Sequence, residues 1–112
     1  MNQRDIEANR HHNRQKFKLG SPMNCIRLNP TNTFGHEVTK THLAYQALKQ
    51  GHDFLTEAEF KGGRADFVDL DDGVITEIIA SEKEESIERK KVKYPLPIKT
   101  VKSFVIKLRG VT

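Results

Sequence analysis

The segment "GGRADFVDLDDGVITEII", residues 62–79, decides the expected fold. Two runs of apolar and β-branched residues, 64–70 and 74–80, are separated by an Asp-Asp-Gly sequence, which is typical of a hairpin turn. The second run is apolar on both faces, as expected for a covered central strand. Each run nevertheless places a carboxylate among apolar neighbours, Asp66 in the first and Glu77 in the second.

These two carboxylates predict a binding site. Because a short turn makes its strands neighbours, Asp66 and Glu77 can converge. An ionised carboxylate buried without a partner costs several kcal/mol, so it must pair with a cation, bind a metal or take up a proton. A divalent cation would relieve their repulsion, and oxygen ligands alone suit Mg²⁺ or Mn²⁺. A second interpretation stays open, in which Arg64 pairs with Glu77, Asp66 satisfies a turn, and no metal binds.

The segments around the hairpin complete an α/β pattern. Their signals predict a helix over about 34–50, a strand over 53–60, a helix beginning at the capping box of Ser81 and Glu84, and one or two strands within 98–108. The strand at 53–60 alternates, which predicts one wet face carrying Glu57 and Glu59. Strict alternation in the next strand places Asp66 on the face of Val68 and Leu70.

Length and composition bound the class of protein. A chain of 112 residues forms one small domain with room for one site. The single Cys25 excludes an intramolecular disulfide and a Cys-rich zinc site, which favours a reducing, intracellular setting. No apolar run is long enough to cross a membrane and the N-terminus is polar, so we expect no membrane partner and a soluble, cytoplasmic protein.

The charge is unevenly distributed. Residues 1–52 carry 8 Lys or Arg and 3 Asp or Glu, whereas residues 53–112 carry 11 and 12. We therefore expect a basic N-terminal arm and connector over 1–32, followed by the domain at 33–112. Sequence-independent contacts with DNA phosphates are expected from Arg10, Arg14, Lys16, Lys18 and Arg64. An address signal or nonspecific RNA contact would have the same composition.

The order of elements and two short motifs resemble the PD-(D/E)XK, or restriction-endonuclease-like, nuclease superfamily. Its αβββαβ core, a central mixed sheet flanked by helices, corresponds to roughly residues 33–106. The "GRAD" sequence stands where the second core strand carries a metal-binding aspartate, and "ITEII" stands where the third carries a glutamate. The chain is also similar to small nuclease-like proteins of archaea and archaeal viruses through "GHE", "GRADFVDLDDG", "TEII.SE.EESIERK" and "KYPLPI".

The resemblance implies an activity and a site. Asp66 and Glu77 are expected to be metal ligands, and Glu37 an accessory ligand, because several superfamily members place an acid on the first helix. The cofactor would be Mg²⁺ or Mn²⁺, and the reaction would be hydrolysis of DNA phosphodiester bonds, as in an endonuclease. Similarity to small resolvases implies a homodimer, and a viral member would act in the host cytoplasm.

One motif position departs from the superfamily. The lysine expected two residues after the glutamate is replaced by Ile79, which can neither orient a water nor stabilise charge. Some members supply this cation from the following helix, which implies Lys90, with Lys83 as the rival. The alternative function is a nuclease-fold protein that binds or assembles on DNA without cutting it, and a domain held by internal salt bridges is a third. The spacing of the histidines matches no zinc signature, so no histidine metal site is expected.

Overall fold

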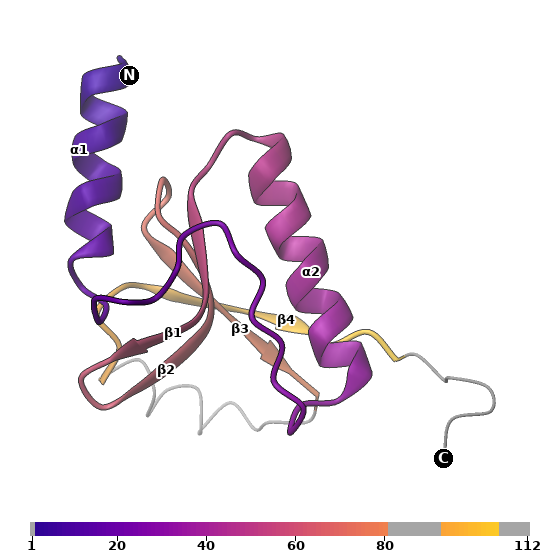
Figure 1. Ribbon diagram of the computed structural model, residues 1–112. Helices are drawn as coiled ribbons and strands as arrows, with labels where there is room; N and C mark the ends of the chain where they lie inside the picture. The colour runs from indigo at the N-terminus through magenta and orange to yellow at the C-terminus, as the bar shows by residue number, and fades with distance from the viewer. Residues whose placement is uncertain (1, 81–92, 106–112) are drawn as a thin grey trace.

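The computed structural model describes residues 2–80 and 93–105. The elements in chain order are the helices α1 (Gln3–Arg14) and α2 (Phe34–Lys49) and the strands β1 (Phe54–Phe60), β2 (Gly63–Asp69), β3 (Val74–Ile79) and β4 (Ile98–Lys102) (Figure 1). Two helices with one four-stranded mixed sheet confirm the α/β class. The helix expected to begin at Ser81 lies outside the described residues, together with Lys83 and Lys90.

The sheet has the order β1-β2-β3-β4. The first three strands form the expected antiparallel meander, with Phe67 opposite Thr76 and Val68 opposite Ile75 at the central pair. The last strand pairs in parallel with β3. The strand β3 is therefore central and buried along most of its length, as its apolar sequence predicts.

Apolar side chains pack on both faces of the sheet. On one face, Phe54 and Phe67 lie against Ala44 and Ala47 of α2. On the other face, a larger cluster contains Phe17, Leu55, Ala58, Phe60, Ala65, Val68, Leu70 and Ile75. Since Phe54 and Phe60 fall in different clusters, the expected regular alternation along β1 is wrong.

The alternation breaks at Glu57. Its φ of 48° lies in the left-handed region, which is uncommon for a residue other than glycine. The β1–β2 register is continuous on both sides of this position, with Thr56 opposite Phe67 and Ala58 opposite Ala65. The inversion turns Glu57 toward α2, so the prediction of a wet face there is wrong: this side chain is buried.

The N-terminal segment packs against the sheet through both charged and apolar contacts. Arg10 of α1 binds the carboxylate of Asp71 with two hydrogen bonds of 2.8 and 3.0 Å. Asn13 donates to the carbonyl of Leu70 at 2.7 Å, and the ring of Phe17 is buried against Phe60. Neither helix in the described part of the chain is long and apolar enough to cross a membrane.

The connector between α1 and α2 follows the outer edge of β1. The amide of Lys18 donates to Glu59 O, and the amide of Asn24 donates to Phe54 O. Further along, the amide of Arg27 donates to the hydroxyl of Thr56. These contacts use polar groups that an open edge strand would expose to other chains.

Candidate functional site

Asp66 and Glu77 line one cavity of about 400 Å³ at the N-terminal end of α2. The other lining residues come from the loop before α2, its first turn, the three later strands and the segments around them: Thr31, Asn32, Thr33, His36, Arg64, Ile78, Ala80, Tyr94 and Ser103. Residues 66 and 77 would be opposite each other if the β2–β3 register were continued by one position. The structure therefore brings the two predicted acids together.

The side chain of Asp66 lies on a different face of the sheet from the one expected. Strict alternation would place it on the face of Val68 and Leu70, but both of those belong to the cluster on the other side of the sheet. Asp66 instead faces α2, as does Phe67, its neighbour along the strand. The alternation on β2 thus breaks where β1 carries the left-handed Glu57. A paired distortion of two strands directs the acid toward the helix.

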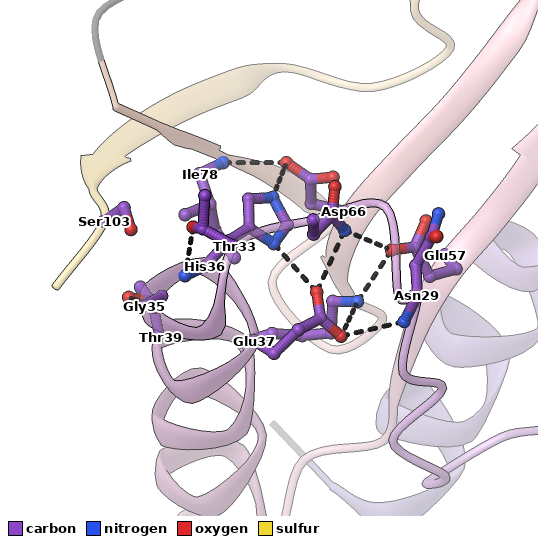
Figure 2. A network of polar contacts seen from close by, with 12 residues as sticks. Asn29, Thr33, Gly35, His36, Glu37, Thr39, Glu57, Asp66, Ile78 and Ser103 are labelled. Atoms are coloured by element: carbon purple, nitrogen blue, oxygen red, sulfur yellow. Dashed lines mark hydrogen bonds and ion pairs between the residues drawn. The ribbon is translucent and has the colours of Figure 1, made fainter. Parts of the chain in front are cut away.

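His36 links Asp66 to Glu37. Its Nε2 atom lies 3.4 Å from Asp66 Oδ2, and its Nδ1 atom lies 3.0 Å from Glu37 Oε1 (Figure 2). The same Asp66 Oδ2 accepts a hydrogen bond of 2.9 Å from the amide of Ile78. These two contacts fix the plane of the carboxylate and leave Asp66 Oδ1 without a hydrogen bond from the residues described. No local sequence pattern indicates this role of His36, because it depends on the approach of α2 to β2.

Glu37 lies behind the cavity rather than on its wall. It accepts hydrogen bonds from the amide of Asn29, the side-chain amide of Asn32 and the ammonium group of Lys40 (Figure 2). Burial alone would raise the pKa of Glu37, but these donors and His36 outweigh it, so that the pKa lies below its usual value. Glu37 is therefore a stable anion that reaches Asp66 through His36.

A buried ion pair supports this arrangement. Lys40 Nζ lies 2.6 Å from Glu57 Oε1 and 3.0 Å from Glu37 Oε2, and its side chain is fully buried. A buried ammonium group requires such partners, because its desolvation costs several kcal/mol. The two acids thus have a cation of their own, which keeps α2 close to the distorted part of β1.

The donor set of the cavity fits a hard divalent cation. Mg²⁺ is commonly bound by one or two carboxylates and keeps several waters or substrate oxygens. Asp66 and Glu77 both line the cavity, and no described residue donates a hydrogen bond to Asp66 Oδ1. Among the described residues, three donor atoms within 4.8 Å of one another occur elsewhere, in His52, Asp69 and Asp72 beyond the other end of the sheet. Glu37 would act on a cation through His36.

The predicted DNA-binding residues are placed differently from one another. Arg64 is half-exposed on the wall of the cavity, 3.6 Å from Glu57 Oε2. Arg10 is held by Asp71 and by the carbonyl of Gly51. The remaining contacts are those of Arg14, which donates to the carbonyl of Ser21, and of Lys18, whose exposed ammonium group lies 3.5 Å from Glu59 Oε2. Lys16 is half-buried after α1 and has no ion pair with a described residue.

Ile79, which stands at the position of the motif lysine, lies next to a lysine of the neighbouring strand. Ile79 is the last residue of β3, and its register partner on β4 is Lys102, which is exposed. In a parallel pair, neighbouring residues of this kind point to the same side of the sheet. The sequence analysis did not find Lys102, because β4 had no predicted register.

Comparison with family models, with curated proteins and with solved structures gave no match.

Proposed function

We propose that the chain is a metal-dependent deoxyribonuclease. It hydrolyses DNA phosphodiester bonds, and its active site is the cavity at the N-terminal end of α2. The observation that carries this proposal is the convergence of Asp66 and Glu77 on one cavity that also has a half-exposed arginine, Arg64, on its wall. Carboxylates beside a cation are what a phosphate and a hard metal ion together require. The resemblance to restriction-endonuclease-like proteins points to the same residues.

The residues have separate roles in this proposal. Asp66 and Glu77 would hold Mg²⁺ or Mn²⁺, which when bound supplies an activated water and neutralises charge on the phosphate. Arg64 binds a non-bridging phosphate oxygen at the cavity wall. His36 keeps the Asp66 carboxylate in one orientation. The amide groups at the start of α2 add a favourable potential for an anion.

The cation that the superfamily takes from its motif lysine needs a replacement here. The resemblance implies Lys90, in the helix expected to begin at Ser81. Among the described residues, Lys102 is the lysine that lies beside Ile79. Either ammonium group would orient the attacking water or stabilise the charge that develops on the phosphate. Replacing each with methionine and measuring the cleavage rate distinguishes them.

Cleavage of end-labelled DNA tests the function directly. Duplex, single-stranded and four-way-junction substrates are incubated with Mg²⁺ or Mn²⁺, and the wild type is compared with Asp66→Asn and Glu77→Gln. Loss of metal-dependent cutting in both variants, with full activity in the exposed control Glu7→Gln, would support the proposal. Metal-independent cutting, or equal cutting by all variants, would contradict it.

A second function is favoured by one observation, the isoleucine at position 79. A nuclease-fold protein that binds DNA and no longer cuts would not need the lysine. In that case a folded wild type would shift all three DNA substrates in a gel and cut none of them. Its affinity would fall steeply with added salt, because phosphate contacts release counterions.

A further inference from the structure

A second apolar stripe runs along α2 on the side away from the sheet. The residues that face the sheet are Gly35, Thr39, Lys40, Ala44 and Ala47, and all are buried. The opposite side carries Phe34, Val38, Thr41, Tyr45 and Leu48, which follow one another at intervals of four, three, four and three residues. This 3.5-residue spacing is the pattern by which one helix packs along another.

No segment within residues 2–80 and 93–105 covers the stripe. The exposed fractions of Phe34, Tyr45 and Leu48 are 47%, 59% and 55%. Leu28 of the connector and Phe104 extend the apolar surface beside it, and together with α2 they line a groove of about 810 Å³. Large apolar side chains gathered in this way mark an interaction site more often than single exposed ones do.

We infer that the stripe binds the same stripe of a second copy of this chain, with the two α2 helices antiparallel. The 3.5-residue spacing fits a helix as the occupant, and α2 is the described helix that carries the matching pattern. A two-fold axis at Thr41, the middle of the stripe, brings Phe34 of each copy to Leu48 of the other. Such an interface is self-complementary, as the common two-fold dimers are.

Charge favours the antiparallel direction. Lys49 is the charged residue at the carboxyl end of the exposed side, and a parallel pair would bring two copies of it together. The antiparallel pair keeps them about 24 Å apart at a rise of 1.5 Å per residue and sets the helix dipoles in opposite directions. In the first turns, Glu37 lines the groove but is mostly buried, and it is paired with the fully buried Lys40. Little charge is thus exposed at the centre of the stripe, as is usual at interface centres.

The exposed apolar area makes up a large part of what a dimer interface buries. Five side chains have exposed fractions between 43% and 70%, those of Leu28, Phe34, Tyr45, Leu48 and Phe104. At about 200 Å² for a side chain of this size, they present on the order of 500 Å² of apolar surface. The polar residues between and around them bring the patch toward the roughly 800 Å² that each partner buries in a standard interface. This inference does not depend on nuclease activity.

Sedimentation equilibrium of the full chain tests the dimer. The wild type is expected at twice the chain mass of 12.8 kDa, and Tyr45→Glu is expected to weaken the dimer at least tenfold. The matched control is Leu19→Glu, since Leu19 is 94% exposed and lies off the stripe. Circular dichroism checks that both variants fold. Two results would overturn the inference. One is a wild type that stays monomeric at about 100 µM, a concentration at which even a weak complex with a dissociation constant in that range forms. The other is a dimer that Tyr45→Glu does not weaken.

Cross-linking tests the geometry. In a Cys25→Ser background, Thr41→Cys places the two new thiols across the proposed two-fold axis, within the range of a disulfide. Mild oxidation is expected to give a covalent dimer rapidly. Lys61→Cys, in the exposed turn between β1 and β2, serves as the control and should react slowly. Equal rates for the two cysteine variants would contradict the placement of Thr41 at the two-fold axis, even if the protein is a dimer. Rapid cross-linking of Leu48→Cys, whose two copies would lie about 21 Å apart in the antiparallel pair at a rise of 1.5 Å per residue, would contradict the antiparallel direction.

Discussion

Lys40 Nζ and Glu57 Oε1 lie 2.6 Å apart in the interior, between a helix and a strand residue with left-handed backbone. Removing the cation alone should leave a buried, uncompensated acid. We therefore expect Lys40→Met to lower the free energy of unfolding by about 3–5 kcal/mol. Urea denaturation measures this loss. The double variant Lys40→Met/Glu57→Gln should recover part of it, and a single variant as stable as the wild type would contradict the role of the pair.

His36 should affect metal binding without contacting the metal. Its contacts to Asp66 and Glu37 orient the carboxylate, so His36→Ala is expected to weaken Mn²⁺ binding about tenfold. Calorimetry measures the affinity without requiring cleavage. The control is His12→Ala on the exposed side of α1. If both variants bind Mn²⁺ as the wild type does, Asp66 is oriented by other contacts.

Arg10 should contribute to stability more than to DNA affinity. Its two hydrogen bonds to Asp71 raise the pKa of the guanidinium group and hold α1 on the sheet. Both Arg10→Gln and Asp71→Asn are expected to cost about 1–3 kcal/mol, and a double-mutant cycle should show coupling. Gel shifts then separate the two roles. Asp71→Asn should leave the DNA affinity unchanged. If Arg10→Gln lowers the DNA affinity far more than Lys16→Gln does, Arg10 contacts DNA.

The stability should vary with pH through His52. Burial lowers its pKa, but the hydrogen bond and charge of Asp69, with the neighbouring acids, outweigh this and raise the pKa above 6.5. The stabilisation is thus complete below pH about 6.5 and is lost as the pH rises through the folded-state pKa. The thermal midpoint of the wild type should fall between pH 6 and 8 more than that of His52→Gln. Parallel curves would contradict this assignment.

Two carboxylates should make the stability fall at low pH. Asp71 and Glu37 have lowered pKa values, because hydrogen bonds from cations and amides outweigh the effect of burial. Their stabilisation is present above the ordinary carboxyl pKa near 4 and is lost as the pH falls below it. The same thermal scans, extended to pH 3, should show a loss that is smaller in Asp71→Asn.

Gly35 should tolerate no side chain. A Cβ atom there would overlap the backbone carbonyl of Phe104, which crosses the first turn of α2. The neighbouring amide of Phe104 donates to the hydroxyl of Thr39, so the crossing cannot shift freely. Gly35→Ala is expected to cost about 1–3 kcal/mol in thermal unfolding. Gln46→Ala, on the exposed side of the same helix, should cost almost nothing.

The sequence predicted the elements better than their exact faces. Period-2 patterns and the Asp-Asp-Gly turn are local signals, and they placed β1, β2, β3 and the end of α2 within a few residues. The left-handed Glu57 had no such signal, because the glutamate is held there by Lys40 from another element. Its effect on Asp66 could therefore not be predicted. The same holds for His36, whose partners are a helix neighbour and a strand residue 30 positions later.

The connector along β1 also has a consequence for synthesis on the ribosome. Phe17 and the amides of Lys18 and Asn24 find partners in residues 54–60, which leave the ribosome later. Until then the N-terminal segment has no strand to cover. Once β1 emerges, however, this segment is already present to occupy its edge. A nascent chain would thus protect its first strand from pairing with neighbouring chains before the rest of the sheet is complete.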